Sequence, residues 1–329
     1  MKSIAVFNNK GGVGKTTFLC NIAGYLALER GKKVLIIDAD PQCNATEALF
    51  SEDRISEIYD DSKSFTLYSI VRPLSIGKGY SEKIVPRKSG RYGLDVLVGD
   101  PKLALAEDVL ARDWGQAVAG DTRGMRTSML FIELVRRCAE YDIVFFDVGP
   151  SLGALNRAVL IACQHYITPM SIDIFSLKAL DNIAYALNEW KGGLNAGLAA
   201  LKDPDEVPDP HYDWNLKFSG YVTQQYTAKK DAQGQSRAVS AYEKIMSRIP
   251  AAIGKNLVDP QMTAQEVVER FSLGSIPTLH SLVPMSQTSR APIFALKSSD
   301  GVVGAHFQKV REVKDTYEQI ADKLVTTLA

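Results

Sequence analysis

A glycine-rich loop between a predicted strand and a predicted helix constrains this chain most. Residues 3–9, SIAVFNN, form a short apolar run, and the loop KGGVGKTT follows at residues 10–17. Apolar residues then recur at helical spacing from Phe18 to Ala27, and Gly31 is a suitable C-terminal cap. A second apolar run, KKVLIIDAD, ends before Pro41. The first 40 residues therefore predict a strand, a loop, a helix and a strand, which together form a βαβ unit.

The rest of the chain continues this alternation of strands and helices. Further strands are predicted at residues 94–99, 142–148, 165–170 and 218–225, with helical patterns such as 128–140 and 177–190 between them. Strands that are apolar on both faces are typical of parallel sheets covered by helices. The predicted fold class is therefore α/β, a doubly wound and mostly parallel sheet flanked by helices, of the P-loop NTPase type.

The sequence predicts a single domain over residues 1–329, with no internal repeat. Three prolines among acidic residues in GGLNAGLAALKDPDEVPDPHYDW predict an exposed, proline-rich insertion at about residues 191–215. A C-terminal helix is predicted at about residues 306–328. Its apolar stripe consists of Val310, Val313, Tyr317, Ile320, Ala321, Leu324 and Leu328.

Composition indicates where the protein is located in the cell more clearly than what it does. Lys+Arg and Asp+Glu both total 38, so any basic surface for a nucleic acid has to be local. The four cysteines form no C-x-x-C pair, which favours reduced, buried thiols over disulfides or a zinc site. The first residues lack a signal-peptide pattern, and no apolar run approaches 18 residues. We therefore expect a cytoplasmic protein that does not span a membrane.

The loop has the chemistry of a phosphate site. Its glycines allow backbone N–H groups to turn inward, and the following helix points its positive end at an anion. Lys15 is expected to contact the β- and γ-phosphate oxygens, and the Thr16 hydroxyl to bind Mg²⁺, although Asn9 replaces the first glycine of the strict motif. The expected nucleotide-binding residues here are Lys10, Gly11, Gly12, Val13, Gly14, Lys15, Thr16 and Thr17.

Aspartates follow two of the predicted strands. Asp147 ends DIVFFD, where a Walker-B carboxylate meets Mg²⁺ or its water, but it could instead cap the next helix. Asp38 and Asp40 lie at the end of the second strand, and one of them could hold an attacking water. The alternative is that both only form a turn.

Three motifs together resemble the ParA/MinD family of deviant Walker-A ATPases. They are KGGVGKTT, IIDADPQCNAT and FFDVGPSLGALNRAVLIACQHYITP, and their order and spacing also match. LDVLVGDPKLALAED and LVPMSQTSRAPIFALK are weaker landmarks. The resemblance is strongest to ParA-type partition ATPases that lack the N-terminal helix-turn-helix, and it implies ATP and Mg²⁺ as cofactors.

The resemblance implies a role for each charged residue of these motifs. Lys10 reaches the ATP of a partner subunit, which implies an ATP-dependent homodimer and explains the second lysine of the loop. Asp40 positions the attacking water in switch I, so the catalytic set is Lys10, Lys15 and Asp40. The Mg²⁺ set is Thr16, Asp38, Asp40 and Asp147, in which Asp38 supports the metal shell and Asp147 is the Walker-B residue of switch II.

Other positions are matched less closely. The resemblance places the adenine pocket at Pro284 and Met285, with Gln224 near the base. Cys43 stands where the family usually has glycine, and Gly149 departs from the commoner D-x-P-P-S pattern. These two departures bear on the geometry of the switches rather than on nucleotide binding.

Residues 217–255 form the basic stretch of the chain, with seven Lys or Arg residues against Asp231 and Glu243. Such a cluster indicates non-specific DNA binding, although the alternative is an ordinary solvated face. The candidate DNA-binding residues are Lys229, Lys230, Arg237, Lys244 and Arg248, and the resemblance favours Arg237. The C-terminal helix is acidic on its polar side, so no membrane partner is expected.

The expected function is a slow, partner-stimulated ATP hydrolase that dimerises on ATP and binds nucleoid DNA. It would segregate or position a plasmid, a chromosome or a protein cargo with a ParB-like or cargo-adaptor partner. One alternative is a signalling or defence switch without DNA binding, and another is a MinD-like membrane-associated ATPase. A metal-cluster reductase would need paired interface cysteines, and Cys138 and Cys163 are not placed for that role.

Overall fold

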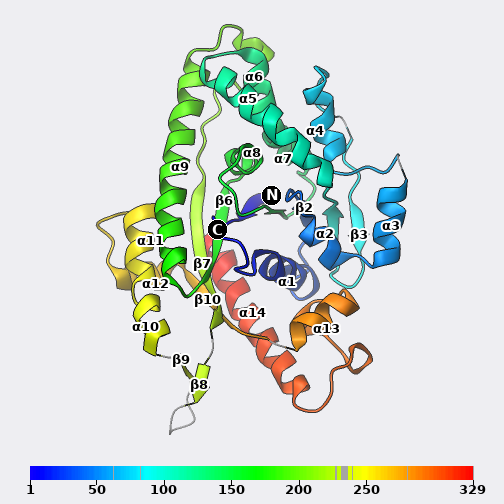
Figure 1. Ribbon diagram of the computed structural model, residues 1–329, viewed down its shortest axis with the longest axis vertical. Helices are drawn as coiled ribbons and strands as arrows, with labels where there is room; N and C mark the ends of the chain where they lie inside the picture. Colours follow the sequence, from blue (N-terminus) through cyan, green and yellow to red (C-terminus); the bar gives the residue numbers. More distant parts are fainter. Residues whose placement is uncertain are drawn as a thin grey trace.

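The computed structural model describes all residues except 62, 82, 227, 231–235, 239, 280 and 329, and the side chains of residues 75 and 225–242 also lie outside its description. An eight-stranded sheet in the order β10-β7-β6-β1-β5-β2-β4-β3 forms the centre, with helices on both faces (Figure 1). All neighbouring strands run parallel except β3 and β4. The predicted doubly wound α/β fold is confirmed.

The strands are short in the first half of the chain and longer in the second. Their bounds are β1 (Lys2–Val6), β2 (Val34–Asp38), β3 (Arg87–Ser89), β4 (Leu94–Leu97), β5 (Ile143–Asp147), β6 (His165–Ser171), β7 (Lys217–Tyr226) and β10 (Ser272–Pro277). A separate antiparallel hairpin consists of β8 (Ala228–Lys230) and β9 (Ser236–Ala238). The sequence did not predict β3 and β10, because RKS and SLGSIP are too short and polar to show a period.

Helices alternate with these strands along the chain. Their bounds are α1 (Lys15–Leu28), α2 (Asn44–Leu49), α3 (Glu52–Asp60), α4 (Tyr68–Ser75), α5 (Glu107–Val118), α6 (Thr122–Ser128), α7 (Leu130–Arg137), α8 (Ala154–Ala162), α9 (Ile174–Ala199), α10 (Ser240–Met246), α11 (Ile249–Leu257), α12 (Ala264–Phe271), α13 (Leu282–Ser289) and α14 (His306–Leu328).

The sheet separates two hydrophobic cores. Along β5, Ile143 and Phe145 belong to the core beneath α1 and α14, whereas Val144 and Phe146 face the core beneath α7, α8 and α9. Successive side chains of a strand point to opposite faces, so a strand covered on both sides is apolar throughout. This two-sided burial holds the carboxyl ends of the central strands in a fixed register.

The expected exposed insertion at residues 191–215 was wrong in its first part, because residues 191–199 continue helix α9. The glycines there do not break the helix; they let it approach α5 closely. A Cβ built on Gly197 would lie 2.2 Å from the backbone oxygen of Ala117, and one on Gly193 would lie 3.0 Å from the Trp114 ring. Close tertiary packing outweighs the low helix propensity of glycine.

The remainder of that segment is partly buried as well. Val207 and Trp214 are 4% and 3% exposed, respectively, and the Trp214 indole N–H donates to the Leu160 carbonyl at 3.0 Å. The Tyr212 hydroxyl donates to the Ile161 carbonyl at 2.6 Å. These side chains cover the end of α8, whereas most residues between 200 and 215 are exposed.

Helix α14 packs its apolar stripe into the core. Val310, Tyr317 and Leu324 are each buried. On the opposite side Arg30 of the segment after α1 pairs with Asp322, and Lys314 pairs with Glu29. In the described residues, no helix is both long and apolar enough to cross a membrane.

Two glycines of α9 allow a direct test of this packing. We expect Gly197→Ala to lower the free energy of unfolding by about 1–3 kcal/mol, because the new methyl group meets the Ala117 carbonyl oxygen. Gly192→Ala has open space around its Cβ and should raise that free energy by about 0.5–1 kcal/mol through helix propensity. Urea unfolding of both variants measures the difference, and equal effects would contradict the packing explanation.

Candidate functional site

The loop between β1 and α1 follows the carboxyl end of a central strand and contains two glycines with positive φ. Gly12 and Gly14 have φ angles of 70° and 78°, in the left-handed region that favours glycine. Gly14 precedes α1, no side chain caps that helix, and a Cβ on Gly14 would lie 2.3 Å from Gln224 Oε1. The first N–H groups of α1 are therefore free of a side-chain cap at the loop, where an anion can bind them.

A cavity of about 860 Å³ lies beside this loop. Its lining comes from the loop, from the segment after β2, from α2 and α3, and from α13 with neighbouring residues. The lining residues include Gly11, Gly12, Val13, Gly14, Lys15, Thr16, Thr17, Asn21, Asp40, Gln42, Asn44, Glu47, Tyr92, Pro150, Val283, Ser286, Gln287 and Arg290. The structure thus brings seven of the eight predicted loop residues to one cavity.

Lys15 lies at the floor of this cavity and is only 8% exposed. Its Nζ is 3.4 Å from the Lys10 carbonyl oxygen. Burial lowers the pKa of Lys15, although the nearby carboxylates of Asp147 and Asp40 oppose that shift. A buried ammonium group with few partners is suited to bind phosphate oxygens.

Thr16 and Asp147 meet although they lie far apart in the sequence. The Thr16 hydroxyl donates to Asp147 Oδ2 at 2.8 Å, and Asp147 Oδ1 is buried without a protein partner. Burial, followed by repulsion from Asp38, raises the pKa of Asp147. A hydroxyl beside a buried, unpartnered carboxylate oxygen fits Mg²⁺, which prefers oxygen ligands.

Asp38, the residue expected to support the metal shell, is held by protein donors. Like Asp147, it is buried and does not line the cavity. Its Oδ2 accepts from the Thr46 amide at 2.7 Å and from the Thr46 hydroxyl at 2.6 Å, and its Oδ1 faces the Asp40 amide at 3.4 Å. In this structure Asp38 therefore holds the segment between β2 and α2, because protein donors already occupy its carboxylate.

Asp40 does line the cavity. Its Oδ1 accepts from the Gln42 amide at 3.0 Å, and a Cβ on Gly149 would lie 3.4 Å from the same oxygen. Cys43 follows with a φ of 54°, a left-handed conformation that favours glycine. Cys43 adopts this conformation although it is not glycine, the residue that the family resemblance leads us to expect there.

Lys10 points away from Lys15. Its ammonium group pairs with Asp173, the residue that caps the N-terminus of α9, and its side chain is 29% exposed. Asp173 Oδ1 accepts from the Phe175 and Ser176 amides, while Oδ2 meets Lys10. Lys10 is thus held at the rim of the loop within its own chain.

The expected base-binding residues are only partly near the cavity. Gln224 contacts the loop, because its Nε2 donates to the Gly14 carbonyl at 3.3 Å. Pro284 and Met285 do not line the cavity, whereas Val283 and Ser286 of the same helix do. A helix turns about 100° per residue, so a motif locates the helix more easily than the face it presents. Tyr92 was missed, because no motif surrounds it.

The basic stretch lies apart from this cavity. In the hairpin β8–β9, Lys229 is paired with Arg237 across the two strands. Lys244 and Arg248 are exposed. The side chains of Lys229, Lys230 and Arg237 lie outside the described part of the structure.

The cysteines do not form a cluster. All four are buried, including Cys138 and Cys163. Within the described residues there is no group of His, Cys, Asp and Glu that could hold a metal ion as a cluster of three or more. The arrangement matches the expected buried thiols of the sequence.

Fold and site together define a nucleotide-binding protein of the P-loop class. The family described as an AAA domain matches residues 1–200, more than half of the chain. The chromosome-partitioning ATPase Soj of Thermus thermophilus is 30% identical over 201 residues, covering 61% of this chain and 67% of that protein. The sporulation initiation inhibitor protein Soj of Bacillus subtilis is 31% identical over 199 residues, covering 60% and 69%, respectively.

A crystal structure of a Corynebacterium diphtheriae protein has a TM-score of 0.69 and 32% identity, covering 88% of this chain and 97% of that one. The chain belongs to the ParA/MinD family of deviant Walker-A ATPases, and its cofactors are ATP and Mg²⁺. Thr16 and Asp147 are the residues whose geometry fits the metal. The sequence alignments with the two Soj proteins span about two thirds of their length.

Replacing Asp147 by asparagine should stabilise the nucleotide-free protein at alkaline pH. The pKa of Asp147 is raised in the folded state, so that state binds more protons than the unfolded chain. The wild-type free energy of unfolding therefore falls as the pH rises above the ordinary aspartate pKa of about 3.9. The side-chain amide of the Asp147→Asn variant does not titrate. The difference in free energy of unfolding, variant minus wild type, should therefore increase by about 1–3 kcal/mol from about pH 5 to about pH 8. Urea unfolding at both pH values measures this gain, and a pH-independent difference would contradict it.

Proposed function

We propose that this protein is an ATPase that dimerises on ATP, binds DNA non-specifically and positions a plasmid, a chromosome or a protein cargo. A ParB-like or cargo-adaptor partner would stimulate its slow hydrolysis. The observation that carries the proposal is the loop with two lysines: Lys15 lines the cavity, whereas Lys10 pairs with Asp173 outside the cavity lining. The partition proteins among its relatives support the positioning role.

Each residue of the site would have a separate task in hydrolysis. Lys15 and the N–H groups of the loop would bind and neutralise the phosphates. Thr16 and Asp147 would hold Mg²⁺, which would further neutralise the phosphate charge when bound. Asp40 would orient the attacking water, because it lines the cavity beside Gly149.

The rim of the loop is suited to a second copy of the chain. Lys10 is partly exposed there, and next to its partner Asp173 lie the apolar side chains of Ile174 and Phe175, which are 42% and 72% exposed. A cation beside exposed apolar side chains can close on a nucleotide bound to another subunit and bury the apolar surface in the same step. We therefore assign this rim to the ATP-dependent dimer.

Loss of Lys10 should prevent dimerisation without preventing ATP binding. In a hydrolysis-blocked Asp40→Ala background with Mg²⁺ and ATP, light scattering should show a dimer, and Lys10→Ala should remain monomeric. Lys32→Ala, which removes an exposed lysine elsewhere, is the control and should dimerise normally. Asp173→Asn keeps an oxygen that can cap α9 but no longer pairs with the Lys10 ammonium group, so this variant should dimerise at a lower protein concentration than the parent. A dimer of Lys10→Ala as stable as the parent's would rule out the role across the interface.

The basic stretch is the proposed DNA surface. Seven positive residues against two negative ones lie within residues 217–255 of a chain that is neutral overall. Lys244 and Arg248 are exposed, and the hairpin pairs Lys229 with Arg237. Contacts of this kind bind the phosphate backbone without reading the base sequence.

DNA binding should therefore be independent of sequence and strongly dependent on salt. If a dimer neutralises about four phosphates, log K should fall against log salt with a slope of about −3.6. The affinity would drop roughly 100-fold between about 50 and about 200 mM salt. Gel shifts of random duplexes with ATP-bound protein measure this slope.

The substitution Arg237→Glu should weaken binding to all duplexes alike and reduce the slope, while ATP-dependent dimerisation persists. Lys88→Glu, a charge reversal at an exposed residue of β3, is the matched control. Unchanged binding after reversal of Lys229, Lys230 and Arg237 together would place the DNA surface elsewhere. No shift at low salt would favour a switch that a protein partner recognises without DNA.

A further inference from the structure

The N-terminus of α8 has no cap from its own sequence. Gly153 occupies the capping position and has no side chain. The N–H groups of Ala154 and Leu155 instead donate to the two carboxylate oxygens of Glu107 on α5, the second at 2.9 Å. A residue 47 positions earlier in the chain therefore does what Ser, Thr, Asp or Asn usually does locally.

Gly153 lies close to the Glu107 carboxylate. Its φ of −82° is available to any residue, so the backbone conformation does not require glycine. A Cβ at this position, however, would lie 2.2 Å from Glu107 Oε1. A larger residue at position 153 would therefore displace the Glu107 carboxylate from the first turn of α8.

The first turn of α8 also holds the loop that follows the Walker-B strand. The side-chain amide Nδ2 of Asn156 donates to the Gly149 carbonyl at 2.8 Å and to the Ser151 carbonyl at 2.7 Å. Gly149 in turn lies against the Asp40 carboxylate, where an added Cβ would be 3.4 Å from Oδ1. Contacts thus run continuously from Glu107 through α8 and residues 148–153 to Asp40.

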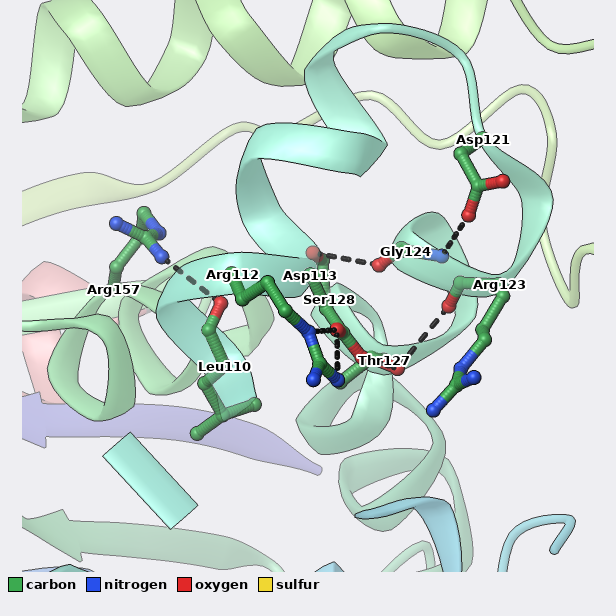
Figure 2. A network of polar contacts seen from close by, with 9 residues as sticks. All are labelled: Leu110, Arg112, Asp113, Asp121, Arg123, Gly124, Thr127, Ser128 and Arg157. Carbon is green, nitrogen blue, oxygen red and sulfur yellow. Dashed lines mark hydrogen bonds and ion pairs between the residues drawn. The ribbon is translucent and has the colours of Figure 1, made fainter. Parts of the chain in front are cut away.

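The helix that carries Glu107 is itself firmly held against α8. Figure 2 shows Arg157 of α8 donating to the Leu110 carbonyl of α5 at 3.4 Å. The Arg157 guanidinium also lies 4.5 Å from the centre of the Trp114 ring. These contacts fix α5 against α8 one turn beyond Glu107.

On its other side, α5 is joined to α6. The buried Asp113 carboxylate accepts from the Arg112 guanidinium at 2.9 Å and from the Thr127 hydroxyl of α6 at 3.0 Å (Figure 2). Contacts with α6 and α8 therefore hold the helix that carries Glu107, and Glu107 itself is only partly exposed.

We propose that Glu107 is a positioning residue for ATP hydrolysis, because its carboxylate sets where residues 148–153 lie relative to Asp40. This role rests on the proposed function of the site as an ATPase. Glu107 does not line the cavity, so it would act on turnover rather than on nucleotide affinity.

The test compares Glu107→Ala and Glu107→Gln with Glu266→Ala in the full chain. Glu266 makes the same kind of bond, to the Thr263 amide at 2.7 Å in the capping box of α12, and α12 contributes no residue to the cavity. The measurements are kcat and KM for ATP with Mg²⁺, and Tm. Glu107→Gln keeps one acceptor oxygen in a side chain of similar shape. It can therefore still be measured if Glu107→Ala does not fold.

We expect Glu107→Ala to lower kcat about tenfold with KM within about twofold of the parent. A tenfold loss corresponds to about 1.4 kcal/mol, the magnitude of a lost helix cap. Glu107→Gln should recover part of kcat, because it retains one acceptor. Glu266→Ala should lower Tm and leave kcat unchanged. A kcat of Glu107→Ala within about twofold of an active parent, or an equal kcat loss in Glu266→Ala, would overturn the proposal. A parent without turnover would overturn the proposed ATPase itself, and the role of Glu107 with it.

A double-substitution cycle tests the contact directly. Gly153→Ala should lower kcat in the parent, because the new methyl group displaces the Glu107 carboxylate. In the Glu107→Ala background, Gly153→Ala should lower kcat by less than about a further twofold, because the clashing oxygen is gone. Losses in kcat that simply multiply would show that the two positions act separately, and would overturn the assignment.

Discussion

The pairing of β2 with β5 sets two carboxylates side by side, and the site is built around that constraint. In the parallel register Asp38 lies opposite Asp147, and both are buried. Burial raises the pKa of each, and the neighbouring charges add to this effect. Two like charges in an apolar environment are unfavourable unless polar partners or cations stabilise them.

The chain resolves this repulsion by giving the two aspartates different partners. Thr46 donates twice to Asp38, which ties the segment after β2 to the strand end. Thr16 donates once to Asp147 and leaves the other oxygen unpartnered. One carboxylate thus becomes structural, whereas the other remains available to a cation beside Lys15. The difference between them lies in the loops, because the strands place both alike.

Much of this arrangement could be predicted from the sequence, because it is encoded in short stretches. The βαβ unit and the loop glycines follow from local pattern, and the meeting of Thr16 with Asp147 follows from two motifs. The hydrogen-bond partners of Asp38 could not be predicted, since they include a hydroxyl eight residues away. The glycines of α9 led us to expect the helix to end there, because glycine has a low helix propensity. Only the packing of α9 against α5 shows that these glycines allow the two helices to approach closely.

Glu107 illustrates why long-range contacts escape sequence patterns. No sequence feature in the first turn of α5 predicts a contact with α8. Gly153 by itself predicts only that α8 begins without a side-chain cap. The information lies in the tertiary arrangement that brings two helix N-termini together. Patterns identify groups that act on the nucleotide, whereas groups that hold the acting loops are found only in the fold.

The ion pair of Lys10 with Asp173 shows how little energy holds the second lysine in place. Both side chains are about one third exposed, and partly exposed pairs contribute only about 0–1 kcal/mol. In the proposed dimer, a nucleoside triphosphate bound to the other subunit would carry several negative charges and attract the ammonium group more strongly than one carboxylate does. Lys10 can therefore exchange partners at small cost. Lys15 is buried, so it is committed to its own cavity, and the two lysines of one loop are suited to two different subunits.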